Sequence, residues 1–123
     1  MKYQGSCHCG NVAFEVEGEI KEVLACNCSI CQRKGSLLWF VPRPAMKLST
    51  PEGAAKVYEF HKHRIHHRFC PTCGIHPYAD ANDPKGNPMA AINVRCIEGL
   101  ELGKLQITPY DGQNWEQARS DLG

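Results

Sequence analysis

The sequence of 123 residues predicts a mainly β domain with few short helical turns. Three observations support this fold class. Apolar and polar residues alternate over short runs, which is the period of a half-buried strand. Prolines, glycines and a turn-rich stretch at 82–88 bound these runs. No segment shows the apolar spacing of a long helix and the chain contains no internal repeat, so we expect a single domain over 1–123.

The first half of the chain contains three predicted strands and one helical turn. Residues 11–17 alternate between apolar and small or acidic side chains, and the next glycine ends that strand. Residues 23–25 form a second, shorter strand. Residues 29–34 form one helical turn, with Ser29 as its cap and the following glycine as its stop. Residues 37–41 form an apolar strand that two nearby prolines end.

The second half contains a predicted hairpin and one further strand. Residues 56–61 and 64–69 are the two strands of the hairpin, and the chain reverses between them near residues 62–63. Residues 89–95 form the last strand, directly after the turn-rich stretch at 82–88. A chain of this length buries a modest core from such elements.

The overall charge and hydropathy exclude several classes of partner. The chain carries 14 Lys and Arg against 13 Asp and Glu, for a net charge of +1. A nucleic-acid-binding surface needs a basic excess, so no nucleic-acid partner is expected. No apolar run approaches the ~20 residues of a membrane span, and no membrane partner is expected either. The first residues lack the apolar stretch of a secretory signal, which predicts a cytoplasmic location.

Eight cysteines are a high content for a chain of this length. In a reducing compartment disulfides are rare, and metal binding is the favoured interpretation. Gly10 and Gly74 follow two of the cysteine pairs and fit the tight backbone of a metal turn. Cys96 stands alone and is expected to be a small buried hydrophobe in a strand. The other seven stand in short motifs that can aim neighbouring thiolates at one zinc ion: Cys7 and Cys9, then Cys26, Cys28 and Cys31, then Cys70 and Cys73.

Zinc chemistry indicates how seven thiols divide. A structural zinc takes four protein ligands, whereas a catalytic zinc takes three and keeps one position open. The two outer pairs can make the closed site, and the middle three thiols the open one. The spacing also allows Cys7, Cys9, Cys26 and Cys28 to close a site together. A histidine can complete the middle group, and the candidates are His8, His61, His63, His66, His67 and His76.

Five segments, spread in order over nearly the whole chain, resemble those of one known family. They are G-S-C-H-C-G-N-V at 5–12, C-N-C-S-I-C-Q at 26–32, R-F-C-P-T-C-G at 68–74, N-V-R-C-I-E-G at 93–99 and Y-D-G at 110–112. Through them the sequence resembles the GFA family, the glutathione-dependent formaldehyde-activating enzymes and their relatives. The resemblance implies a small zinc-stabilised fold of folded-over sheets, a β-tent, and a single GFA-like zinc-binding domain over the whole chain.

The resemblance also implies two metal sites and two zinc ions (Zn²⁺) per chain. The first and last cysteine pairs hold a structural zinc, and the middle group holds a catalytic zinc. The implied ligands are Cys7, Cys9, Cys70 and Cys73 for the structural zinc, and Cys26, Cys28 and Cys31 for the catalytic zinc.

The open site indicates a chemistry. Three thiolates weaken zinc as a Lewis acid and favour a further soft ligand. A substrate thiol bound there loses its proton and becomes a nucleophile. Glutathione fits this role, since its thiolate adds to formaldehyde to give S-hydroxymethylglutathione. The predicted function is therefore a carbon–sulfur lyase of the GFA type that acts on such a thiol adduct.

Two alternatives come from other classes of protein. One is a non-catalytic zinc module that binds a protein partner, and the other is a thiol or zinc sensor whose open site loses zinc on oxidation. The fourth position of the middle site discriminates among them. A protein side chain that fills it permanently would count against an enzyme, whereas water or a small thiol there would favour one.

Other side chains near these motifs have candidate roles. Arg33, Lys34 and Arg68 can pair with the carboxylates of glutathione, although a solvated surface role is favoured. Trp39 and Phe40 are expected in the core rather than in the wall of a substrate site.

The histidines of the predicted hairpin fall into two pairs. His66 or His67 is a candidate general base. His61 and His63 are expected to be exposed residues of the hairpin.

Overall fold

The computed structural model describes residues 1–60 and 64–110. These residues form ten strands in two sheets and one short α-helix, so the predicted mainly β class is confirmed. No helix among them has the length and apolarity needed to cross a bilayer.

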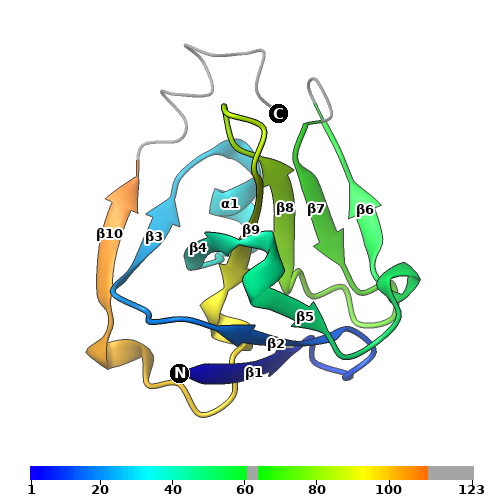
Figure 1. The fold of residues 1–123 in the computed structure, drawn as a ribbon, viewed down its shortest axis with the longest axis horizontal. Coiled ribbons are helices and arrows are strands. Elements are labelled where there is room, and N and C mark those ends of the chain that lie inside the picture. Colours follow the sequence, from blue (N-terminus) through cyan, green and yellow to red (C-terminus); the bar gives the residue numbers. More distant parts are fainter. Residues whose placement is uncertain (61–63, 111–123) are drawn as a thin grey trace.

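The smaller sheet has three antiparallel strands in the order β1-β2-β5, which are β1 (Lys2–Ser6), β2 (Ala13–Glu17) and β5 (Met46–Leu48). The larger sheet has seven strands in the order β10-β3-β4-β9-β8-β7-β6. In this sheet only β10 pairs in parallel with its neighbour. Figure 1 shows β10 and β6 at opposite edges of the large sheet, with the small sheet lying across its lower end. The strands of the large sheet are β3 (Glu22–Cys26), β4 (Leu38–Pro42), β6 (Lys56–Tyr58), β7 (His66–Phe69), β8 (Tyr78–Asn82), β9 (Pro88–Asn93) and β10 (Gln106–Tyr110).

The helix lies where the sequence predicted it, but its cap differs. It is α1 (Ser29–Lys34), and Gly35 ends it in the left-handed conformation at φ 69°. The prediction that Ser29 caps the helix is wrong, because Cys28 is the residue before the first turn and no side chain makes the capping hydrogen bond. The described residues also contain four 3-10 turns, at Arg43–Ala45, Glu52–Ala54, Val94–Cys96 and Leu102–Lys104.

The predicted hairpin is confirmed where the structure describes it. Strands β6 and β7 pair antiparallel, with Val57 opposite Arg68. Residues 61–63, which include the expected reversal, lie outside the described residues. Of the predicted strands, the last ends early: the Asn93 side chain accepts a hydrogen bond from the Arg95 backbone N–H at 3.2 Å and starts a 3-10 turn. The prediction that Cys96 lies in a strand is therefore wrong.

One face of the large sheet forms the core. Trp39, Ile92 and Tyr78 stand opposite one another on β4, β9 and β8, and all three are buried. They belong to one apolar cluster with Phe14 and other residues of the small sheet. The Phe14 and Tyr78 rings meet edge to face at 6.5 Å, and the Tyr3 ring packs edge to face on Trp39 at 5.8 Å. The small sheet therefore covers this face.

The opposite face carries a second cross-strand row. Residues paired across antiparallel strands share a face, and the pairs here run without interruption from β4 to β6. The row consists of Phe40, Ala91, Ala79, His67 and Tyr58. The two alanines at its centre have small side chains, so they leave a depression between the larger side chains on either side. The space above the alanines belongs to the candidate site.

Candidate metal centres

The first metal centre combines two distant turns. Cys7 and Cys9 follow β1, whereas Cys70 and Cys73 follow β7, and their four sulfur atoms all lie within 4.8 Å of one another. The Sγ atoms are 3.8 Å apart between Cys7 and Cys9, and 3.5 Å apart between Cys9 and Cys70. A tetrahedral zinc with bonds of about 2.3 Å separates its sulfur ligands by about 3.8 Å. The donor set and spacing of this four-thiol cluster therefore fit zinc.

Backbone donors already favour thiolate sulfur in this cluster. The Val12 N–H donates to Cys7 Sγ at 3.3 Å. The N–H groups of Thr72 and Cys73 donate to Cys70 Sγ at 3.3 and 3.4 Å. The hydrogen bond from Cys73, together with that from Thr72, lowers the pKa of the Cys70 thiol to about 6.

The four-thiol cluster is part of the core. Cys7 and Cys70 are buried in the apolar cluster, and Cys73 packs against it. Gly10 and Gly74 have φ angles of 84° and 79°, which L side chains rarely adopt, so each turn needs its glycine. The cluster joins the end of the small sheet to a turn of the large sheet that is about sixty residues further along the chain.

The second metal centre is local in sequence. Cys26 ends β3, Cys28 precedes α1 and Cys31 lies inside it, and their sulfur atoms lie within 4.8 Å of one another. The Cys28 N–H donates to Cys26 Sγ at 3.4 Å. Hydrogen bonds from the Cys26 and Cys31 thiols lower the pKa of the Cys28 thiol. Three thiols around one point match the donor set of an open zinc site.

In the part of the chain that the structure describes, no further ligand atom lies within 4.8 Å of all the sulfur atoms of this three-thiol cluster. Among residues 1–60 and 64–110, no other His, Cys, Asp or Glu ligand atom joins the group. His8, His66, His67 and His76 therefore do not complete it, and His61 and His63 lie outside the described residues.

The three thiols open onto a cavity of about 390 Å³, which we call the thiol cavity. Ala79 and Ala91 form its floor, and His67, Lys34 and Tyr110 are its ionisable lining residues besides the cysteines. The remaining lining residues are Leu24, Leu38, Phe40 and Ile65. The cavity is therefore mostly apolar and lies over the alanine row of the large sheet.

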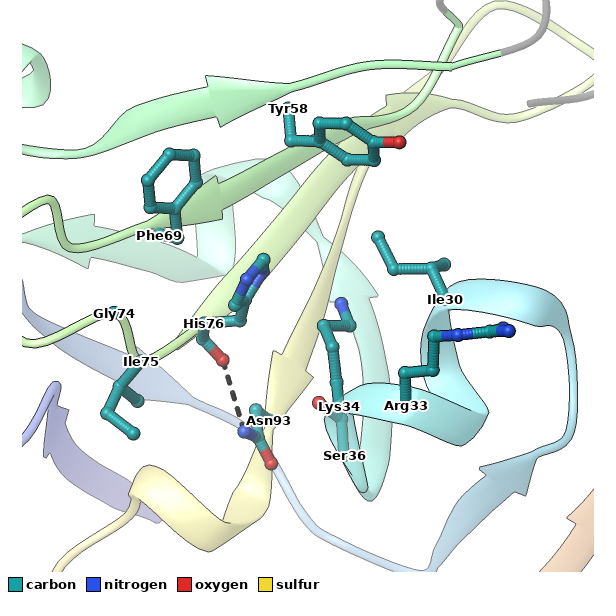
Figure 2. A pocket seen from close by; sticks show the side chains of 10 residues that line it. All are labelled: Ile30, Arg33, Lys34, Ser36, Tyr58, Phe69, Gly74, Ile75, His76 and Asn93. Atoms are coloured by element: carbon teal, nitrogen blue, oxygen red, sulfur yellow. Dashed lines mark hydrogen bonds between the residues drawn. The ribbon is translucent and has the colours of Figure 1, made fainter.

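A second cavity of about 580 Å³ adjoins the first and is more polar. Lys34 lines both cavities, so they meet at this side chain. Figure 2 shows the Lys34 ammonium directed into this polar cavity, while the Arg33 guanidinium extends away from His76. Asn93 donates to the backbone carbonyl of His76 at 3.1 Å, and this bond fixes one wall.

His67 is a buried imidazole that lines the thiol cavity. It is 4% exposed, and neither ring nitrogen has a hydrogen-bond partner among residues 1–60 and 64–110. Its ring stacks on Phe60 at 5.4 Å. Burial, with a smaller contribution from the Lys34 charge, lowers the pKa of His67 to about 4, although Cys28 opposes the shift. At neutral pH His67 is therefore uncharged and offers one donor and one acceptor to a molecule in the thiol cavity.

Two opposing effects act on the pKa of Lys34. Burial lowers the pKa of its ammonium, whereas the nearby thiols of Cys31, Cys28 and Cys26 raise it. A cation at this border can attract an anionic group in the polar cavity.

Several candidate residues turn out to lie elsewhere. Arg68 forms an ion pair with Asp80 at 3.3 Å, and His66 contacts the same carboxylate at 2.9 Å. His66 and Arg68 lie on the face of β7 opposite to His67, and neither lines the thiol cavity. Cys96 belongs to neither cluster, and burial raises the pKa of its thiol to about 11.

The expectation for the two aromatic residues of β4 is half right. Trp39 is 7% exposed and lies in the core, as expected. The expectation that Phe40 lies in the core is wrong: it is 50% exposed and lines the thiol cavity. Alternation along the strand sends the two side chains to opposite faces. Sequence analysis also missed Ala79 and Ala91, because alanine carries no chemistry and only the strand register reveals the floor that they form.

Comparisons with known proteins agree with this architecture. The model of the family described as "Glutathione-dependent formaldehyde-activating enzyme" matches residues 2–115. A crystal structure of a Rhodobacter sphaeroides protein is similar at a TM-score of 0.72 and 28% sequence identity, over 85% of this chain and 99% of that chain. The family match spans both cysteine clusters and all of the strands from β1 to β10.

Proposed function

The chain belongs to the family of glutathione-dependent formaldehyde-activating enzymes, and on this premise we propose that it is a zinc-dependent carbon–sulfur lyase. Its substrate in this proposal is a thiol adduct such as S-hydroxymethylglutathione. One observation carries the proposal: the three-thiol cluster faces a cavity, and no fourth ligand joins it among residues 1–60 and 64–110. The four-thiol cluster, in contrast, has a complete ligand set for a structural zinc.

The proposal assigns the metal ligands by this difference. Cys7, Cys9, Cys70 and Cys73 would hold a structural zinc, and Cys26, Cys28 and Cys31 a catalytic zinc. A zinc ion held by these three thiolates would lower the pKa of a further thiol and so make that thiol a nucleophile at neutral pH. The proposal includes two zinc ions per chain, one domain over 1–123 and a cytoplasmic location, where the eight free thiols stay reduced.

His67 is the residue best placed to handle the proton of the reaction. When the adduct forms, the C–S bond is made and the thiol proton ends on the carbonyl oxygen. When the adduct is cleaved, that bond breaks and the hydroxyl proton leaves. The His67 ring lines the cavity, and neither of its nitrogens has a hydrogen-bond partner within the described ranges 1–60 and 64–110. Above its pKa of about 4 the ring is neutral, so one nitrogen can accept this proton.

The polar cavity suits the rest of glutathione. A tripeptide with two carboxylates needs cations and hydrogen-bond donors beside the sulfur site. Lys34 supplies a cation at the border of the two cavities, and Arg33 supplies a second one at the rim. The Arg33 guanidinium also donates to the Ser29 carbonyl at 2.8 Å, which holds its side chain along α1.

Exchange NMR between formaldehyde and S-hydroxymethylglutathione tests the proposal. We expect zinc-loaded protein to speed this exchange and Cys28→Ala to abolish the effect. Gln32→Ala is the matched control, since Gln32 is exposed on α1 and lines neither cavity. An unchanged exchange rate with fully loaded protein would count against a lyase and favour the non-catalytic module or the sensor.

A further inference from the structure

The floor of the thiol cavity is built from the smallest side chains available. Ala91 and Ala79 face each other across β9 and β8, between Phe40 on one side and His67 on the other. Larger residues at either position would fill the space beside the three thiols. The sheet therefore keeps an apolar volume open next to the sulfur site.

This volume is far larger than a one-carbon adduct needs. The hydroxymethyl group has two non-hydrogen atoms, and each takes up about as much space as one water molecule, which occupies roughly 30 Å³ in the liquid. The thiol cavity has about 390 Å³. An apolar cavity of roughly 150 Å³ is enough to hold benzene. Formaldehyde would leave most of this cavity unfilled, whereas an aromatic or branched group would contact its walls.

The two cavities also differ in chemistry. The polar cavity suits the charged part of a peptide thiol, and the apolar one lies on the other side of Lys34. We propose that the thiol cavity holds the carbonyl-derived part of the adduct, and that this part is an apolar group of aromatic or branched aliphatic size. The natural carbonyl substrate is then a hydrophobic aldehyde; this inference rests on the proposed thiol-adduct function.

The reaction balances for such an aldehyde as it does for formaldehyde. The thiol sulfur forms one bond to the aldehyde carbon, the carbonyl π bond opens, and the thiol proton ends on the oxygen. The reverse step releases the aldehyde and regenerates the thiol. No oxidant, reductant or other reactant is needed.

Binding of two unreactive thioethers tests the inference without relying on turnover. S-benzylglutathione and S-methylglutathione present the same peptide and the same kind of sulfur, and they differ only in the apolar substituent. On zinc-loaded protein, titration calorimetry should give a Kd at least tenfold lower for the benzyl compound. Unmodified glutathione serves as the reference for binding of the peptide thiol.

Variants of the floor and wall locate the effect. Ala91→Leu adds three carbons to the cavity floor and should remove the tenfold advantage of the benzyl compound while leaving S-methylglutathione binding within twofold. Ala81→Leu is the matched control, because Ala81 lies two residues along β8 and pairs with Met89 outside the thiol cavity. Phe40→Ala is a second probe that adds no bulk: Phe40 is half exposed, and its loss should weaken only the benzyl compound.

Each outcome decides between the two proposals. A benzyl advantage that Ala91→Leu and Phe40→Ala reduce, and Ala81→Leu does not, supports the hydrophobic aldehyde. Equal affinities for both thioethers, or a benzyl advantage that the cavity variants leave intact, overturns it and leaves the thiol-adduct function standing. If glutathione and both thioethers fail to bind, the proposed function itself is wrong and the inference falls with it.

Discussion

The four-thiol and three-thiol clusters use the same ligand but stand in different surroundings. The first gathers Cys7, Cys9, Cys70 and Cys73 from two turns and lies largely within the core. The second gathers three thiols from six consecutive residues and faces a cavity. Ligand type alone does not separate a structural from a catalytic metal site. The number of thiols and what faces the remaining position are what distinguish these two.

The two clusters also differ in what they connect. The four-thiol cluster links residues about sixty positions apart, and a zinc bound there would fix how the small sheet meets the large one. The three-thiol cluster lies within the single β3–α1 turn, and a zinc bound there would fix only the geometry of that turn. Loss of the first should therefore cost the fold, and loss of the second should cost only the site.

The largest effect is expected for Cys70→Ala. Structural zinc sites contribute roughly 10–16 kcal/mol of apparent binding energy, which is comparable to the roughly 5–15 kcal/mol stability of a typical domain. Cys70 is fully buried, so the variant also leaves a gap in the core. We expect it to lose both zinc ions and its near-UV circular dichroism. A variant that stays folded with a melting temperature near that of the native chain would show that the four thiols do not hold the fold.

A smaller effect is expected for Cys28→Ala. Cys28 is half-buried at the start of α1 and outside the apolar cluster. The variant should lose one of two zinc ions and keep its fold, with a fall in melting temperature of less than about 10 °C. Zinc quantification with thermal unfolding measures both quantities, and Gln32→Ala on the same helix controls for a change in α1. Global unfolding of Cys28→Ala would mean that the two clusters have exchanged roles.

The three-thiol side of the molecule places a buried, neutral imidazole, His67, beside its cavity, and pH should reveal it. Burial lowers the pKa of His67 from 6.5 to about 4. Above pH 6.5 the ring is neutral in both folded and unfolded chains, and its contribution to stability is complete. As pH falls towards 4, only the unfolded chain binds the proton, so the folded state loses on the order of 3 kcal/mol.

His67→Phe isolates this contribution. Phenylalanine keeps an aromatic ring against Phe60 but cannot take up a proton. Urea unfolding should show that the stability of the native chain falls more steeply than that of the variant between about pH 6.5 and about pH 4.5. Because loss of the four-thiol zinc would itself unfold the chain, zinc content is measured at each pH, and the comparison uses only those pH values at which both proteins keep their zinc. Parallel curves would mean that His67 is protonated in the folded chain at the same pH as in the unfolded one.

Strand β2 was found because it buries one face and leaves the other more polar. Phe14 and Val16 alternate with less buried side chains because β2 packs on the core from one side. Strand β8 was missed because its outward face carries Ala79, whose small side chain weakens the apolar alternation. Strand β10 was missed because it lies at an edge of the sheet and contains a proline.

The candidate site was predictable where its chemistry is local. The C-x-C-x-x-C spacing alone brings Cys26, Cys28 and Cys31 together. No spacing rule joins two turns about sixty residues apart, and that pairing came from the family resemblance. The cavity could not be predicted from the sequence, because its lining depends on which residues meet across six strands. Phe40 shows this most clearly: its neighbour Trp39 is core, and only the sheet decides which of the two faces the thiols.

The smallest effect is expected for Cys96, and it tests whether the four-thiol cluster is complete. Cys96 lies close enough to Cys7 and Cys73 for their charges to contribute to the raised pKa of its thiol, after burial. It nevertheless lies outside the group of four. Cys96→Ala removes one half-buried sulfur and should cost about 1 kcal/mol with both zinc ions retained. If the variant instead lost a zinc, Cys96 would take part in the core-embedded site together with the four thiols. The two sites could then no longer be contrasted as one with a complete set of four ligands and one with an incomplete set of three.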